Sequence, residues 1–160
     1  DTARRQPQQL PNAEEQFLVS PPRHKLNDHL WEQGWDILFF AGHSSSQPEI
    51  GQGHLQINAR DTISLEQVKY ALRKSIQNGL KLAIFNSCDG LELARNLVNL
   101  HLPQLIVMRE PIPDVVAQAF LKHFLLAFSS GESLYLSVRQ AREKLQPLEK
   151  EFPCATWLPV

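Results

Sequence analysis

The sequence has few cysteines, no excess of either charge and no long apolar run. Its two cysteines, Cys88 and Cys154, are too few for a disulfide framework and lack the spacing of a zinc site, so we expect a reducing, cytoplasmic compartment and no metal. Sixteen lysines and arginines balance 17 acidic residues, which argues against a nucleic-acid partner. No stretch approaches the roughly 18 apolar residues of a membrane span, so no membrane partner is expected.

The length and the hydrophobic content are those of one compact domain. Of the 160 residues, 42% are hydrophobic, which is enough to line one core. Residues 1–16 are polar and contain two prolines, so we divide the chain into an N-terminal segment, 1–16, and a domain, 17–160. The only methionine is Met108, and the last six residues are mostly apolar. We therefore expect a domain excised from a longer polypeptide.

Hydrophobic periodicity predicts strands that alternate with helices. Residues 17–19 predict a short buried strand, and the dense apolar run 35–41 predicts a central parallel strand buried on both faces. Residues 42–53 are rich in turn formers, and residues 54–58 alternate as an exposed hairpin strand does. Further strands are predicted over residues 80–85 and 105–108, and helices over residues 23–33, 91–98, 117–128 and 134–145.

One more helix carries explicit end signals. Ser64 and Gln67 form a capping box, and Ile63 and Val68 are spaced for the hydrophobic staple that accompanies it. The dipeptide at residues 78–79, Asn-Gly, ends this helix.

Strands that alternate with helices indicate a parallel sheet, whose ligands gather at the carboxyl ends of the strands. Two reactive residues follow dense strands there: His43 comes after the run 35–41, and Cys88 comes after the run 80–85. An imidazole within hydrogen-bond reach of a thiol can remove its proton or stabilise the thiolate. A helix that begins near Gly90 would add the positive end of its dipole, and Gly90 would allow close backbone approach.

Each residue also has a purely structural interpretation. A lone cysteine at a strand end is more often a packing residue than a nucleophile. Asp89 is more readily explained as the N-cap of the following helix than as a specificity residue. The pair of His43 and Cys88 favours catalysis, because both follow dense strands in loops where packing demands are weak.

Five segments together resemble a CHAT domain, the caspase-like cysteine peptidase module named for its association with tetratricopeptide repeats. They include Ala-Gly-His43 at the end of one strand and Asn-Ser-Cys88-Asp-Gly at the end of another, and they span residues 36–43, 53–58, 82–90, 107–114 and 157–159. The resemblance implies an α/β, three-layer αβα caspase-hemoglobinase fold with a mostly parallel sheet. The polar residues 1–16 are then a remnant of the first helix region, and the first central strand is missing.

The same resemblance implies a cysteine endopeptidase without a cofactor, acting on protein or peptide substrates. His43 would be the base and Cys88 the nucleophile, with the backbone N–H groups of Ser44 and Cys88 as the oxyanion hole. Asn86 and Asp89 would line a polar substrate pocket. Regulation would come from other segments of the same longer polypeptide, including tetratricopeptide repeats.

Two alternatives stay open. A missing first strand would leave one edge of the sheet exposed, or covered by another segment of the longer polypeptide or by a neighbouring molecule. This favours a catalytically silent scaffold or interaction domain. Gly42-His43-Ser44 also imitates the nucleophile elbow of serine hydrolases, although position 46 is not glycine and no helix pattern follows.

Overall fold

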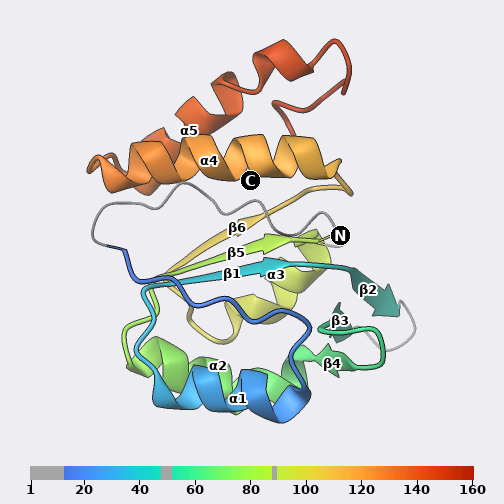
Figure 1. The fold of residues 1–160 in the computed structure, drawn as a ribbon, viewed down its shortest axis with the longest axis vertical. Coiled ribbons are helices and arrows are strands. Elements are labelled where there is room, and N and C mark those ends of the chain that lie inside the picture. The colour runs from blue at the N-terminus through green and yellow to red at the C-terminus, as the bar shows by residue number, and fades with distance from the viewer. Residues whose placement is uncertain (1–12, 48–51, 88–89) are drawn as a thin grey trace. The chain divides into compact units, whose positions relative to one another are not determined.

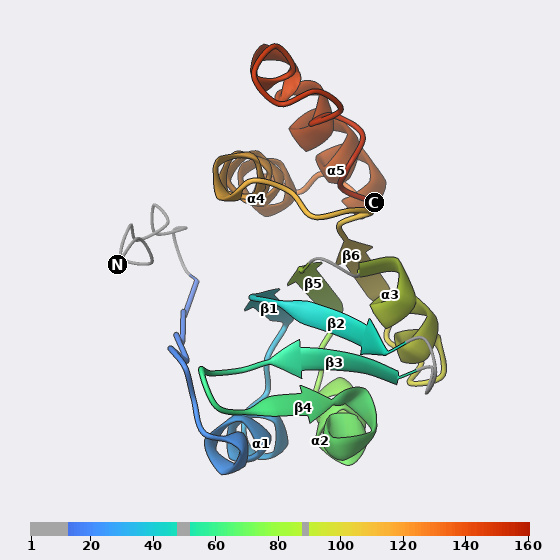
Figure 2. The same ribbon diagram turned by 90° about the vertical axis from the view of Figure 1, so that its right-hand side faces the viewer.

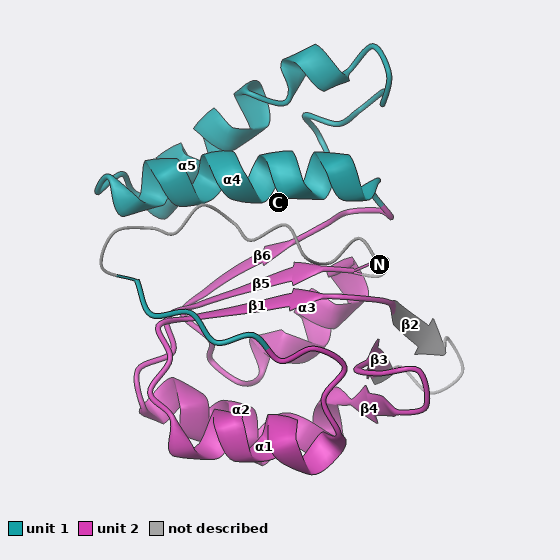
Figure 3. Cartoon of the chain, in the orientation of Figure 1, with its two compact units in different colours: residues 1–17, 112–159 teal, residues 18–111, 160 magenta. Residues whose placement is uncertain are grey.

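A computed structural model describes residues 13–47, 52–87 and 90–160. The chain forms two compact units, which are coloured separately in Figure 3. One comprises residues 18–111 with residue 160, and the other comprises residues 112–159 with the N-terminal segment up to residue 17.

A parallel sheet organises the unit of residues 18–111. Its strands are β1 (Ile37–Ala41), β5 (Leu82–Asn86) and β6 (Gln104–Val107), in the order β1-β5-β6. The helices of this unit are α1 (Arg23–Glu32), α2 (Leu65–Gln77) and α3 (Gly90–Val98), shown in Figure 1. This mixed α/β architecture with a parallel sheet confirms the predicted fold class and is consistent with a caspase-like three-layer fold.

A second, antiparallel sheet follows β1 in the chain. It contains β2 (Ser44–Gln47), β3 (Gln52–Gln56) and β4 (Thr62–Ser64), in the order β2-β3-β4 (Figure 2). The prediction of a turn-rich segment over residues 42–53 was therefore wrong for β2, and the hairpin strand begins two residues earlier than expected. The serine run of β2 has no alternation of polar and apolar residues, so hydrophobic periodicity could not find it.

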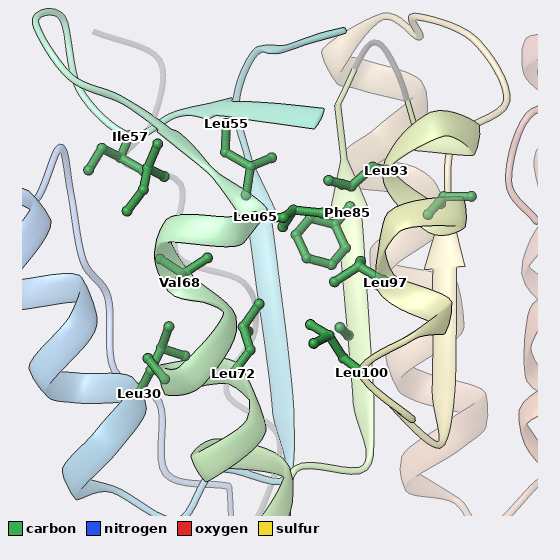
Figure 4. Close-up of a cluster of buried hydrophobic side chains, with 14 residues drawn as sticks. Leu30, Leu55, Ile57, Leu65, Val68, Leu72, Phe85, Leu93, Leu97 and Leu100 are labelled. Atoms are coloured by element: carbon green, nitrogen blue, oxygen red, sulfur yellow. The ribbon is translucent and has the colours of Figure 1, made fainter. Parts of the chain in front are cut away.

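The core of this unit lies between the parallel sheet and helices α1, α2 and α3. Alternate residues of β5, Ala83 and Phe85, point into it. Figure 4 shows the cluster, to which α1, α2, α3 and β3 all contribute; its labelled members are Leu30, Leu55, Ile57, Leu65, Val68, Leu72, Phe85, Leu93, Leu97 and Leu100. The cluster joins both sheets, because Leu55 of β3 belongs to it together with Ala83 and Phe85 of β5.

Helix α2 begins and ends as its sequence predicts. The Ser64 hydroxyl accepts a hydrogen bond from the N–H of Gln67, and the Gln67 side chain accepts one from the N–H of Ser64. Ile63 and Val68 are both buried, as the staple requires. The helix stops before Gly79, whose φ of 118° is one that other residues rarely adopt.

Two sequence predictions in this region were wrong. Residues 17–19 form no strand, and the side chains of Phe17 and Val19 are 63% and 80% exposed. The run is only three residues long and precedes two prolines, which have no N–H to donate to a sheet.

The second wrong prediction concerns β1. Among the described strands it lies at the sheet edge rather than the centre, and Phe39 is 42% exposed. Its other face packs on the core through Leu38 and Phe40. A dense apolar run does not distinguish an edge strand from a central one, because that difference depends on which other strands are present.

The second unit is a helical hairpin with a C-terminal turn region. Helices α4 (Asp114–Ser129) and α5 (Leu134–Glu143) pack together, and the short 3₁₀ helix η1 (Gln146–Leu148) follows. Both helices were predicted. Within α4 the rings of Phe124 and Phe128 stack with centroids 5.4 Å apart. No helix in the described part of the chain is long and apolar enough to cross a membrane.

Candidate functional site

The carboxyl ends of β1 and β5 lie side by side in the parallel sheet. Ala41, the last residue of β1, pairs with Asn86, the last residue of β5. The N–H of Gly42 then donates to the carbonyl of Asn86 at 3.2 Å. In a parallel ladder an N–H bonds to the residue that precedes its own partner, so this bond fits a register in which Gly42 would lie beside Ser87.

His43 directly follows this last pair and is exposed. Its carbonyl accepts a hydrogen bond from the N–H of Gln56 in β3, at 2.9 Å. The histidine backbone is thus held from two sides, by the β5 end through Gly42 and by β3 through Gln56. Sequence reasoning missed the contribution of Gln56, because it depends on β2 turning back against β3.

Cys88 and Asp89 lie outside the described residues. The structure describes the residues that flank them, Ser87 and Gly90. Counted along the chain, Cys88 comes two residues after the end of β5, just as His43 comes two residues after the end of β1. The two strand ends are therefore level with each other, while the proposed roles of Cys88 and Asp89 stay predictions.

Helix α3 begins at Gly90, where the sequence predicts a helix start. A Cβ atom built on Gly90 would overlap the carbonyl oxygen of Met108 and would lie 2.9 Å from the Cβ of Val107. This confirms that glycine permits a close backbone approach, here between the helix start and the end of β6. The positive end of the helix dipole therefore lies two residues beyond Cys88 in the chain.

Ser44 is the first residue of β2 and pairs with Leu55. Hydrogen-bonded and non-hydrogen-bonded pairs alternate along an antiparallel ladder. The N–H of Gln56 bonds to the carbonyl of His43, so His43 and Gln56 form a hydrogen-bonded pair. The next pair, Ser44 with Leu55, is therefore a non-hydrogen-bonded pair. The N–H of Ser44 is therefore directed away from β3.

The position of Ser44 at the start of β2 tests the serine hydrolase alternative. A nucleophile elbow needs a helix directly after its serine, whereas Ser44 begins a strand. This geometry excludes the elbow.

Asn86, predicted to line a substrate pocket, is half-buried at the end of β5. Its carbonyl accepts the N–H of Gly42, so its backbone has a structural role beside the strand ends. The predicted contribution of its side chain to substrate binding stays a prediction.

The other cysteine, Cys154, lies in the second unit and is exposed, with a φ of 70°. Nothing in its surroundings resembles the strand-end arrangement around His43. Among the described residues, no group of three or more His, Cys, Asp and Glu side chains could hold a metal ion.

Two comparisons relate the chain to known proteins. A search of curated proteins finds no match. A family model, that of the CHAT domain, matches residues 5–158. CHAT domains are related to the caspase-like peptidases, and the match covers nearly the full length of the 160 residues. The chain therefore belongs to the CHAT domain family.

Proposed function

We propose that this CHAT domain is a cysteine endopeptidase that uses His43 and Cys88 as a catalytic dyad. The observation that carries the proposal is the level ending of β1 and β5, with Gly42 bonded to Asn86 just before the two reactive residues. If the ladder continued one residue further, His43 and Cys88 would be direct neighbours on the same face of the sheet.

The reaction would proceed through an acyl-enzyme. His43 takes the thiol proton of Cys88, and the thiolate attacks the substrate carbonyl to give a tetrahedral oxyanion. His43 then returns the proton to the leaving amine as the C–N bond breaks. Water, deprotonated by His43, attacks the thioester, and release of the carboxylic acid restores the thiol.

Two features support this chemistry. The N–H of Ser44 is directed away from the β2–β3 ladder, as an oxyanion donor must be, and such a donor contributes about 3–4 kcal/mol in well-measured hydrolases. Helix α3 begins two residues after Cys88, so its dipole favours a thiolate. A polar substrate pocket formed by Asn86 and Asp89 belongs to the same proposal.

Thiol labelling tests the dyad directly. An ordinary thiol with a pKa of about 8.5 is only about 3% ionised at pH 7, so an activated Cys88 should react with iodoacetamide about tenfold faster than Cys154. Replacing His43 by alanine should remove most of this difference and leave the rate at Cys154 unchanged. Mass spectrometry of the peptides around each cysteine measures both rates in one sample.

Equal rates at the two cysteines would refute the dyad and favour the silent scaffold. A second measurement uses peptides that carry a C-terminal electrophile, with the site of attachment located by mass spectrometry. Attachment at Cys88 that is lost in His43→Ala supports a peptidase. Capture at Ser44, or none in a broad peptide panel, contradicts it.

A further inference from the structure

A buried hydroxyl without a hydrogen-bond partner lies beside the proposed dyad. Ser87 is 5% exposed, and its Oγ has no partner among the residues that the structure describes. A buried polar atom of this kind costs stability and calls for an explanation. Ser75 of α2 and Ser137 of α5 share this property but lie within helices. Ser87 alone of the three immediately precedes the proposed nucleophile.

The neighbours of Ser87 follow from the sheet register. The β1–β5 register ends at Ala41 with Asn86, and continued by one residue it sets Ser87 beside Gly42 on the same face of the sheet. A Cβ built on Gly42 would lie 3.4 Å from the carbonyl oxygen of Gln56. That carbonyl therefore overlies the face on which the Ser87 side chain lies.

Gln56 is also the residue that holds His43. Its N–H donates to the His43 carbonyl at 2.9 Å, while its own carbonyl faces Gly42. Because Gly42 has no side chain, nothing on that residue separates Ser87 from Gln56. A side chain there would also meet the Phe40 ring at 2.9 Å.

We propose that Ser87 is a positioning residue, whose hydroxyl donates its hydrogen to the Gln56 carbonyl when substrate is bound. This bond would tie the strand that precedes Cys88 to the residue that fixes the His43 backbone. The inference rests on the proposed function, because it concerns the alignment of the dyad. It assigns no proton transfer to Ser87.

A double-mutant cycle with His43 tests this role in the full chain. The readout is the rate at which a peptidyl chloromethyl ketone alkylates Cys88. We expect Ser87→Ala to slow this reaction about fivefold, the factor expected for one hydrogen bond of typical net strength. In the His43→Ala background the same change should have no effect, because there is no imidazole left to align. Ser87→Thr, which restores a hydroxyl, should recover most of the rate.

Ser75→Ala is the matched control, since it removes another buried and unpartnered hydroxyl from the same unit. It should leave the alkylation rate unchanged, and thermal unfolding should show that all variants fold. If Ser87→Ala slows alkylation equally with His43 present and with His43 replaced by alanine, or does not slow it at all, the positioning role is overturned. If the unmodified chain lacks fast, His43-dependent labelling, the proposed function fails instead.

Discussion

The sharpest structural prediction concerns Gly90, the first residue of α3. Alanine is normally the better helix former by about 1 kcal/mol, so Gly90→Ala would be stabilising on propensity alone. At this position the added Cβ would overlap the Met108 carbonyl oxygen and lie 2.9 Å from the Val107 Cβ. Both neighbours belong to β6 or its immediate continuation, and backbone cannot rotate away as a flexible side chain can.

Overpacking of this kind costs about 1–3 kcal/mol. A clash with backbone favours the upper end of that range, and subtracting the propensity gain from it leaves a net loss of about 2 kcal/mol in the free energy of unfolding. With a urea m-value of roughly 2 kcal/mol/M, the unfolding midpoint should fall by about 1 M. The substitution should also slow alkylation of Cys88, because the start of α3 must move away from β6.

The matched control is Gly53→Ala in β3. Its added Cβ would meet nothing closer than 3.4 Å, at the Cδ1 of Leu93, so its midpoint should change little. A Gly90→Ala midpoint equal to or above that of the unmodified chain would show that the helix start does not press on β6. Equal losses in both variants would mean that any added methyl is costly in this unit, and the specific argument would fail.

Two further predictions concern the ends of helices. Replacing Ser64 by alanine should lower the stability by about 1 kcal/mol, because the Gln67 N–H loses its cap; chemical denaturation measures this, and an unchanged midpoint contradicts it. Hydrogen bonds from Thr156, with one from the Cys154 N–H, lower the pKa of Glu149. The resulting stabilisation is present above the ordinary glutamate pKa and is lost as the pH falls through the lower, folded value. Glu149→Gln should therefore lower the melting temperature more at pH 7 than at pH 3, and an equal decrease at both would refute the assignment.

The reliable sequence predictions were those with a local cause. The capping box of α2 needs only Ser64 and Gln67 at the right spacing, and both of its hydrogen bonds are present. Dense apolar runs marked three strands of the parallel sheet, with ends displaced by a few residues. Gly90 was expected at a helix start with a close backbone approach, and the structure shows that the approach is to the carbonyl oxygen of Met108.

The failures involve partners that are distant in sequence. Three apolar residues before two prolines were predicted to form a strand, but they pair with no strand among the described residues, and Phe17 is exposed. The serine strand β2 exists because its backbone pairs with β3, whatever its side chains are.

The amino-acid sequence by itself determined the α/β class, the location of each helix and the two reactive residues that follow dense strands, because these depend on periodicity, caps and short spacings. Only the tertiary structure decided that Ala41 and Asn86 end level, that Gln56 holds His43, and that β1 lies at the edge of the described sheet. Register and strand order are set by pairing between segments far apart in the chain, and one strand's composition does not encode which neighbour it will meet.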